Sequence, residues 1–138
     1  MKEEIYIDTI SGEKLIKETW YYPNGNIEEE IYYLNNKKHR EDGPAIIYHN
    51  ENGNIEREYY RLNDKLHRND GPAIICYYYN GNIESESYYI NDKRYREDGP
   101  AIIWYYPNGN IEEEIYYLND KKITDDLQIM VLKGLNNI

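Results

Sequence analysis

The side chains that could do chemistry are few, and most of them recur at a fixed spacing. His39 and His67 are 28 residues apart, and the next position in that series is Tyr95. His49 belongs to a second series, in which the later members are Tyr77 and Tyr105. A histidine that can be exchanged for tyrosine suits packing or hydrogen bonding better than metal ligation. The sequence therefore predicts no metal site.

The cysteine and the carboxylates also lack the arrangement that catalysis needs. Cys76 shares its series with Trp20, Tyr48 and Trp104, which is typical of a small buried filler, and no neighbouring base would activate it. The carboxylates could imitate a glycosidase pair, but a carboxylate repeated in several copies indicates a solvated acidic face. No EF-hand loop, phosphate-binding glycine loop or serine elbow is present. We expect no enzyme, no catalytic residue and no cofactor.

Charge and composition exclude further classes. The formal net charge is −10, and a nucleic-acid binder would show a basic stripe. The same charge disfavours anionic membranes, and no apolar run approaches the ~18 residues that membrane insertion requires. Met1–Glu4 does not open a signal peptide, and the single cysteine cannot form an internal disulfide. We expect an intracellular protein of a reducing cytoplasm, or of a host cytoplasm or virion if the chain is viral.

Most of the chain is built from four copies of one 28-residue unit. Asn-Gly-Asn-Ile starts at positions 24, 52, 80 and 108, and Gly-Pro-Ala-Ile-Ile starts at 43, 71 and 99. A Leu/Ile-Asn-Asn/Asp-Lys marker keeps the same step. Such arrays usually bind or brace rather than catalyse. The predicted organisation is a capping strand and turn in residues 1–14, units at 15–42, 43–70, 71–98 and 99–126, and a capping helix in residues 127–138.

Each unit predicts two strands. In the second unit they are Ala45–His49 and Ile55–Leu62, both rich in isoleucine and tyrosine. Asn52-Gly53 lies between them and predicts a type I′ hairpin turn, which needs positive φ at both central residues. Asn63 begins the next turn. The predicted fold class is all-β: an elongated antiparallel β-meander of four units, two strands each, forming a thin sheet with partly wet faces.

A longer connector joins each unit to the next. In the second unit it contains Arg68, Asp70, Gly71 and Pro72. Proline lacks an N–H and belongs at the start of a strand, and the glycine could supply a bulge. We interpret the arginine and aspartate as structural staples, and the arginines of the connectors also as the partners of glutamates on the strands.

The two faces of the longer strand differ in how strictly they repeat. One face carries Glu-x-Glu-x-Tyr in all four units, starting at positions 28, 56, 84 and 112. The other face varies from unit to unit and is the candidate partner-binding face: Glu29, Ile31, Tyr33, Arg57, Tyr59, Arg61, Ser85, Ser87, Tyr89, Glu113, Ile115 and Tyr117. Rows of exposed tyrosine suit partner binding, and cross-strand aromatic ladders that only hold the sheet are the alternative.

The two ends depart from the repeat, as capping segments do. Ile5–Ile7 and the Ser11-Gly12 pair predict an extra strand and turn at the N-terminus. Thr124 or Asp125 predicts a helix start, and apolar residues follow at helical spacing. We expect this helix to fold over the open end of the sheet and shield its edge.

The unit resembles MORN-type repeats. The residues that carry the resemblance are Asn-Gly-Asn-Ile, the strand with Glu and Tyr-Tyr, and the connector His-Arg-Glu-Asp-Gly-Pro-Ala of residues 39–45. This connector is similar to the variant found in giant DNA viruses and some phages, and Tyr21–Gly25 is also similar to an antitoxin-like bacterial branch. The resemblance covers roughly residues 15–126. It implies an elongated array of hairpins that acts as an interaction scaffold, and no catalytic residues.

Two functions from different classes follow. The first is a non-enzymatic scaffold that binds a protein partner or a second copy of itself. A viral structural or accessory protein is one form that this scaffold could take. The alternative is an antitoxin-like or inhibitor module that neutralises a basic partner through its acidic face. An enzyme is a third and weaker hypothesis.

Overall fold

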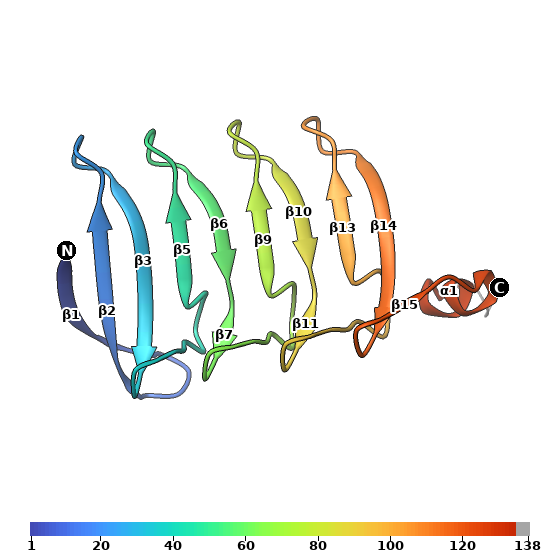
Figure 1. Cartoon of the computed structure of the whole chain (residues 1–138), viewed down its shortest axis with the longest axis horizontal. Coiled ribbons are helices and arrows are strands. Elements are labelled where there is room, and N and C mark those ends of the chain that lie inside the picture. The colour runs from blue at the N-terminus through green and yellow to red at the C-terminus, as the bar shows by residue number, and fades with distance from the viewer. Residues whose placement is uncertain (135–138) are drawn as a thin grey trace.

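The chain forms one long antiparallel sheet whose strands stand side by side in chain order (Figure 1). The structure is a computed structural model that describes residues 1–134. The N-terminal strand lies at one end of the row, and the C-terminal helix lies beyond the other end. The predicted all-β hairpin array is confirmed.

The elements of the array fall into three groups. The strands of the main row are β1 (Lys2–Ile7), β2 (Lys14–Tyr21), β3 (Ile27–Leu34), β5 (Ile46–His49), β6 (Ile55–Tyr59), β9 (Ile74–Tyr77), β10 (Ile83–Ser87), β13 (Ile102–Tyr105) and β14 (Ile111–Leu118). Short strands at the lower end are β4 (Lys37–Lys38), β7 (Arg61–Leu62), β8 (Lys65–Leu66), β11 (Tyr89–Ile90), β12 (Lys93–Arg94) and β15 (Lys121–Ile123). The helix is α1 (Asp126–Leu132).

One of the two turns of each unit differs from the type that the sequence predicts, and the other has the left-handed residues expected of Asn63 and Asp64. Gly53 alone has positive φ (93°) in the upper turn, where its N–H donates to the Asn50 carbonyl at 3.0 Å. Asn52 has no positive φ, so the predicted type I′ turn there is wrong. The two-residue type I′ turn lies instead at Asn63 and Asp64, with φ of 48° and 68° between β7 and β8. Asn and Asp tolerate the left-handed region because their short side chains form local hydrogen bonds. The Asn-Gly pair of the other turn is the stronger type I′ signal in the sequence, and it led to the wrong assignment.

Replacing Gly53 by valine should lower the free energy of unfolding by about 1–3 kcal/mol, because a β-branched residue is strained at this φ. Lys65→Ala is the control, since this side chain is exposed and should change stability by less than about 0.5 kcal/mol. Urea unfolding of both variants checks this prediction, and equal midpoints would refute the turn assignment.

The sheet has one open face and one covered face. The open face carries the alternating residues that include Glu29, Ile31 and Tyr33, together with their neighbours on adjacent strands. The covered face carries Glu30 and Tyr32 and lies under the connectors, which are residues 39–44, 67–72 and 95–100. Among the described elements the main contacts join adjacent strands, so the array is a single layer, and the lower hairpins β7–β8 and β11–β12 form two-stranded sheets of their own.

The core lies between the covered face and the connectors. The most deeply buried apolar side chains there are small or aliphatic, with one position per unit: Leu15, Ala45, Ala73 and Ala101. Tyr32 and Tyr116 are also almost fully buried. A core this thin depends on stacking and hydrogen bonding as much as on apolar volume.

The C-terminal helix starts where the sequence predicts but does not bury its apolar stripe. Asp125 is the N-cap, and its carboxylate accepts a hydrogen bond from the Gln128 N–H at 2.9 Å. Leu127, Met130 and Val131 are all exposed, so the expectation that the helix covers apolar groups with them is wrong. The helix instead presents the half-buried Ile129 to the groove beside β14. The rest of the predicted segment, residues 135–138, lies outside the described residues.

Candidate functional site

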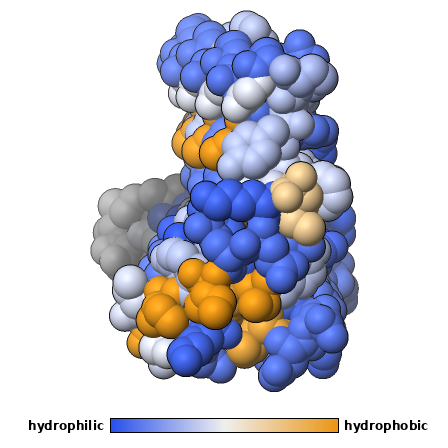
Figure 2. Space-filling model, turned by 90° about the vertical axis from the view of Figure 1, so that its left-hand side faces the viewer, coloured by the Kyte–Doolittle hydropathy of each residue, from blue (hydrophilic) through white to orange (hydrophobic). Residues whose placement is uncertain are grey.

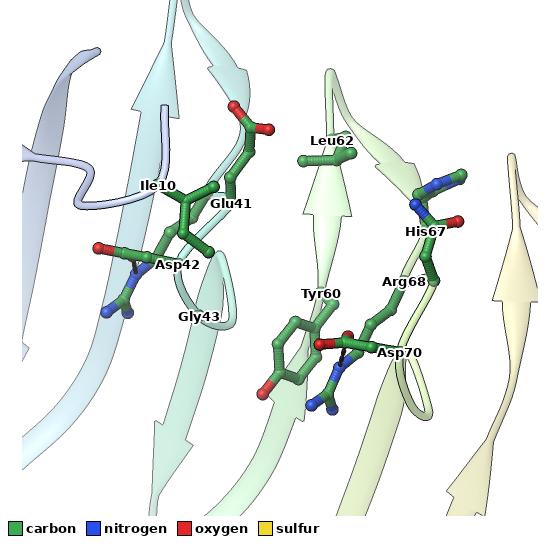
Figure 3. Close-up of a pocket in the computed structure, with 11 residues that line it drawn as sticks. Ile10, Glu41, Asp42, Gly43, Tyr60, Leu62, His67, Arg68 and Asp70 are labelled. Atoms are coloured by element: carbon green, nitrogen blue, oxygen red, sulfur yellow. Dashed lines mark hydrogen bonds and ion pairs between the residues drawn. The ribbon is translucent and has the colours of Figure 1, made fainter. Parts of the chain in front are cut away.

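Each connector places an arginine guanidinium over the ring of a tyrosine of the covered face; Tyr32 is buried, and Tyr60 and Tyr88 are half-buried. The distances from the guanidinium carbon to the ring centroid are 4.1 Å for Arg40–Tyr32, 3.9 Å for Arg68–Tyr60 and 4.1 Å for Arg96–Tyr88. Figure 3 shows the second of these pairs, at a shallow hollow between two successive connectors. Cation–π stacking of this kind stabilises a site by roughly 0.5–2 kcal/mol. The arginines are therefore structural.

Hydrogen bonds fix the arginine in place. Arg68 donates from Nε to Asp70 Oδ1 at 3.1 Å and from Nη1 to the Pro72 carbonyl at 3.1 Å, and the third connector repeats both bonds. The predicted Arg–Asp staple is therefore present. A Cβ at Gly71 would lie 2.8 Å from the Arg68 guanidinium carbon. Gly71 has no positive φ, so it makes room for the arginine and does not supply the predicted bulge.

The glutamates of the covered face do not pair with these arginines, which corrects the sequence interpretation. Glu30 contacts His49 Nε2 at 2.9 Å and Lys17 Nζ at 3.1 Å. The equivalent glutamates accept hydrogen bonds from tyrosine hydroxyls of the following unit: Tyr77 to Glu58 and Tyr105 to Glu86. The exchange of His49 for tyrosine therefore reflects a conserved geometry of hydrogen bonding between units, as the sequence predicts for that series.

Burial and these bonds change the acidity of both partners. Burial raises the pKa of the Tyr77 hydroxyl above its ordinary value, and the bond to Glu58 raises it further. Burial alone would raise the pKa of Glu30, but the bonds from His49 and Lys17 outweigh it and lower that pKa. The tyrosines therefore stay protonated donors, and Glu30 stays an ionised acceptor, at neutral pH.

The first connector is held by the N-terminal segment. Asp42 accepts hydrogen bonds from the Tyr6 hydroxyl at 2.6 Å, from the Thr9 N–H at 2.8 Å and from Arg40 Nε at 2.6 Å. Asp8 is fully buried and accepts from the N–H of Glu41 at 2.6 Å. Burial opposes ionisation of each carboxyl, but the donors outweigh it and lower the pKa of both. This end of the array is therefore the most strongly braced.

One cluster near this end has the composition of a cation site. Glu13, His39 and Glu41 have ligand atoms within 4.8 Å of one another, and His39 is only 6% exposed. His39 Nδ1 accepts a hydrogen bond from the Asn63 N–H at 3.1 Å, so the ring proton of the neutral imidazole is on Nε2, which faces Glu13 at 3.7 Å. A metal would need the lone pair of Nε2, so this tautomer suits an interaction with Glu13 better than metal ligation.

A second set of hydrogen bonds between units lies in the lower hairpins, and the sequence analysis did not predict it. The Asp64 carboxylate accepts from the Lys38 N–H at 2.7 Å, and Asp92 and Asp120 make the same bond to Leu66 and Arg94. The signal was present: this position is aspartate in three units and Asn36 in the first, which has no preceding unit to hold.

The predicted partner-binding residues of the longer strands lie on the open face. Two sets form rows that run across the main sheet: Glu29, Arg57, Ser85 and Glu113; and Ile31, Tyr59, Ser87 and Ile115. The third set, Tyr33, Arg61, Tyr89 and Tyr117, lies at the lower end, where each residue pairs with the short strand of its own hairpin. They are not equally available, since Ile31 and Ser85 are buried among their neighbours whereas Arg57 and Glu113 are exposed.

Tyrosine and arginine side chains interlock on this face. The Tyr48 and Tyr59 rings meet edge to face at 5.9 Å between centroids, and the Arg57 guanidinium lies 5.7 Å from the Tyr48 ring. Arg94 reaches both Tyr89 and Tyr117, at 5.8 and 5.4 Å. The face therefore holds rigid aromatic and arginine groups that are only partly covered, which is the composition of binding hot spots.

Half of the open face comes from the shorter strands, whose residues are not in the predicted set of partner-binding residues. Their residues alternate with the predicted ones along both rows of the main sheet: for example, Tyr48 lies between Glu29 and Arg57, and Trp104 lies between Ser85 and Glu113. Trp20 and Trp104 are 44% and 39% exposed. The same period-2 reading of the shorter strands would have found them.

The N-terminal end of the array adds an apolar patch. Figure 2 views this end and shows hydrophobic residues gathered on it. The exposed apolar residues of this region are Met1, Ile5, Ile7, Ile10 and Ile16. Ile5 and Ile16 are paired across β1 and β2, and Ile16 is paired with Tyr33 of the open face. The open face thus continues into this patch.

The fold and its uncovered face define an elongated β-hairpin repeat protein. Comparison with protein families agrees: the family model of the MORN repeat variant matches residues 14–35, 74–91 and 102–119. These segments contain the hairpins β2–β3, β9–β10 and β13–β14. The predicted resemblance to MORN-type repeats is thus confirmed for these three segments.

Comparisons with curated proteins and with solved structures gave no match. In the described part of the chain, the seven-residue helix α1 is far shorter than a membrane-crossing helix needs to be.

Proposed function

We propose that this protein is a non-enzymatic scaffold that binds a protein partner, or a second copy of itself, through the open face. The invariant residues of the covered face stabilise the fold, because their side chains contact other residues of the array. A reducing intracellular compartment, cytoplasmic or viral, suits the single free thiol of Cys76.

The observation that carries the proposal is the contrast between the two faces. The covered face is almost invariant between units and lies under the connectors. The open face varies between units and presents tyrosine, tryptophan and arginine without a covering layer in the described residues. A surface of this kind matches the anatomy of protein interfaces, in which aromatic and arginine side chains provide most of the binding energy.

An inhibitor that neutralises a basic partner is the second candidate. It is favoured by the net charge of −10 and by the exposed glutamates of β14, Glu112, Glu113 and Glu114. The two candidates differ in their response to salt. Binding through the aromatic face should change little between 50 and 500 mM salt, whereas charge neutralisation should weaken by more than about tenfold.

Pull-down from the source cells with quantitative mass spectrometry tests the scaffold. The double variant Arg57→Ala/Trp104→Ala removes two exposed hot-spot groups and should reduce recovery of the partner by at least about tenfold. Lys93→Ala, an exposed residue of a lower hairpin, is the control and should recover the partner normally. Equal recovery with the double variant, or a positive hydrolase screen without any partner, would contradict the proposal.

A further inference from the structure

Two segments of the chain are identical in sequence, but only one of them has a strand of a following unit beside its outer edge. Residues 20–35 and residues 104–119 both read Trp-Tyr-Tyr-Pro-Asn-Gly-Asn-Ile-Glu-Glu-Glu-Ile-Tyr-Tyr-Leu-Asn. They form the last strand of the first hairpin, β3, and of the last hairpin, β14, with the turns before them. β3 is followed in the sheet by β5 of the next unit, whereas β14 is followed only by the short strand β15 of its own hairpin.

The first copy shows what this edge binds. The strand β5, Ile-Ile-Tyr-His, pairs antiparallel with β3, with Glu30 opposite Ile47. The Tyr32 N–H donates to the Ala45 carbonyl at 2.8 Å. In an antiparallel pair, every second residue of a strand forms main-chain hydrogen bonds to the same neighbour. Glu30 is two residues from Tyr32, so its main-chain N–H and carbonyl also face β5. The Glu30 carboxylate contacts His49 Nε2 at 2.9 Å.

The turn above β3 adds three more bonds to the same neighbour. Tyr22 donates its hydroxyl proton to the His49 carbonyl at 2.7 Å. The side-chain amides of Asn24 and Asn26 both donate to the Glu51 carbonyl at 2.9 Å. The edge and its turn therefore form one continuous set of donors and acceptors that recognises an incoming strand and the turn after it.

The second copy carries the same groups, but no strand of a following unit lies beside them in the described residues. Tyr106 is 47% exposed, and Asn110 and Glu114 are exposed. The strand β15 pairs only with Tyr116–Leu118, so the rest of the outer edge of β14 has no partner strand. The helix α1 stands beside this edge and leaves a groove of about 530 Å³.

The groove has the edge of β14 on one side and the helix on the other. Glu113, Glu114 and Ile115 line the strand side, and Ile129 and Lys133 line the helix side. The Lys133 Nζ lies 5.7 Å from the centroid of the Tyr116 ring, which corresponds to the place that the connector arginines take on the other units. The helix thus substitutes for a connector and not for a strand.

We propose that the outer edge of β14 is a binding site for an extended segment of another protein, which adds to the sheet as an antiparallel strand. The segment carries two consecutive aliphatic residues followed by an aromatic residue and then a histidine or tyrosine. The aliphatic residues continue the sheet, and the last side chain reaches the Glu114 carboxylate. This site is separate from the open face and does not depend on the function proposed for that face.

A second copy of the chain fits this edge poorly. Strand directions alternate along the sheet, so β1 runs in the same direction as β14, and head-to-tail stacking would place them parallel. Pairing β14 with its own copy brings Glu112–Glu114 of two chains together, each chain with a formal charge of −10. A partner segment that is neutral or basic avoids both problems.

Peptide binding measured by fluorescence anisotropy tests the proposal. The probe is a labelled synthetic peptide of residues 43–54 of this chain, Gly-Pro-Ala-Ile-Ile-Tyr-His-Asn-Glu-Asn-Gly-Asn, which is the occupant of the identical edge. We expect saturable binding below about 1 mM to the full-length protein, with at least about tenfold weaker binding of a scrambled peptide.

Two variants locate the bound peptide. Glu114→Pro removes an outward N–H and the carboxylate and should weaken binding by at least about tenfold. Tyr106→Phe leaves the fold intact because the side chain is exposed, and it should weaken binding by about threefold through loss of one hydrogen bond. Tyr21→Phe is the matched control on an exposed ring of the first unit and should leave binding unchanged.

Four outcomes would overturn the proposal. They are absence of binding up to about 1 mM, equal binding of the scrambled peptide, and wild-type affinity in both the Glu114→Pro and Tyr106→Phe variants. The fourth is a concentration-dependent dimer in the wild-type protein that Tyr106→Phe and Glu114→Pro both dissociate, because that result would assign the edge to a second copy.

Discussion

Replacing Tyr32 by alanine should lower the free energy of unfolding by about 3–5 kcal/mol, a large part of the stability of a domain of this size. Tyr32 is 3% exposed, and its ring meets the Tyr6 ring edge to face at 5.0 Å and the Arg40 guanidinium at 4.1 Å. The substitution opens a cavity under the first connector and also leaves the buried Arg40 without its stacking surface.

The adjacent tyrosine is the matched control for this result. Tyr33 points to the open face and is only half-buried. Tyr33→Ala should therefore lower the free energy of unfolding by about 1 kcal/mol. Urea unfolding of the two variants measures the difference, and equal losses would contradict the assignment of one face to the core and the other to the surface.

The second large effect is expected at Asp42. Asp42→Asn should lower the free energy of unfolding by about 2–3 kcal/mol, because an ionised acceptor that is 7% exposed and bound by Tyr6, Thr9 and Arg40 is lost. The equivalent Asp98 has an 88% exposed side chain that contacts only Arg96, so Asp98→Asn should change stability by about 0.5 kcal/mol or less.

The Asp42 contribution should also depend on pH in a defined direction. The ordinary pKa of an aspartate is about 3.9, and the pKa of Asp42 in the folded state lies below it. The ionised form of Asp42 therefore stabilises the fold at neutral pH. This stabilisation is complete above about pH 5 and is lost as the pH falls towards the folded pKa. The stability difference between wild type and Asp42→Asn should therefore shrink between about pH 5 and pH 3, as measured by urea unfolding at each pH.

The position of the loss can be read from the two tryptophans. Trp20 is in the first unit and Trp104 in the last, so each fluorescence signal reports on one end of the array. In a repeat array each unit contacts mainly its neighbours. In Asp42→Asn proteins that keep only one tryptophan, the urea midpoint reported by Trp20 should be lower than the midpoint reported by Trp104. A loss that is equal at both ends would show that the array unfolds as one unit.

The repeat made the fold predictable from the sequence. The 28-residue step, the two β-rich segments per unit and the departures at both ends together led to the antiparallel array that the structure has. The connector arginine and aspartate were also assigned correctly as staples. These features are local, because Arg68 and Asp70 are two residues apart and meet within one connector.

What the sequence did not give correctly depends on contacts between units. Glu30 meets His49, which is 19 residues further along in the next unit, so an alignment of unit upon unit places the two in separate columns. The same reason hid the bond from Asp64 to the preceding hairpin. The type I′ turn was assigned to Asn52-Gly53 because Asn-Gly is a strong local signal, whereas the Asn63-Asp64 turn, which has that type, contains no glycine.

The account depends most on one face of the sheet being open while the other is covered, and cysteine reactivity measures this directly. Cys76 lies on the open face, where it is paired with Arg57 and Ser85, and adjacent Ile75 lies on the covered face and is 9% exposed. The experiment compares the thiol reaction rates of the wild-type protein and of the variant Ile75→Cys/Cys76→Ser at low micromolar concentration. We predict that Cys76 reacts in the folded protein at a rate that low urea hardly changes, whereas the thiol at position 75 reacts only as fast as unfolding exposes it. Equal protection of the two thiols at every protein concentration would contradict the open face and the partner-binding function proposed for it.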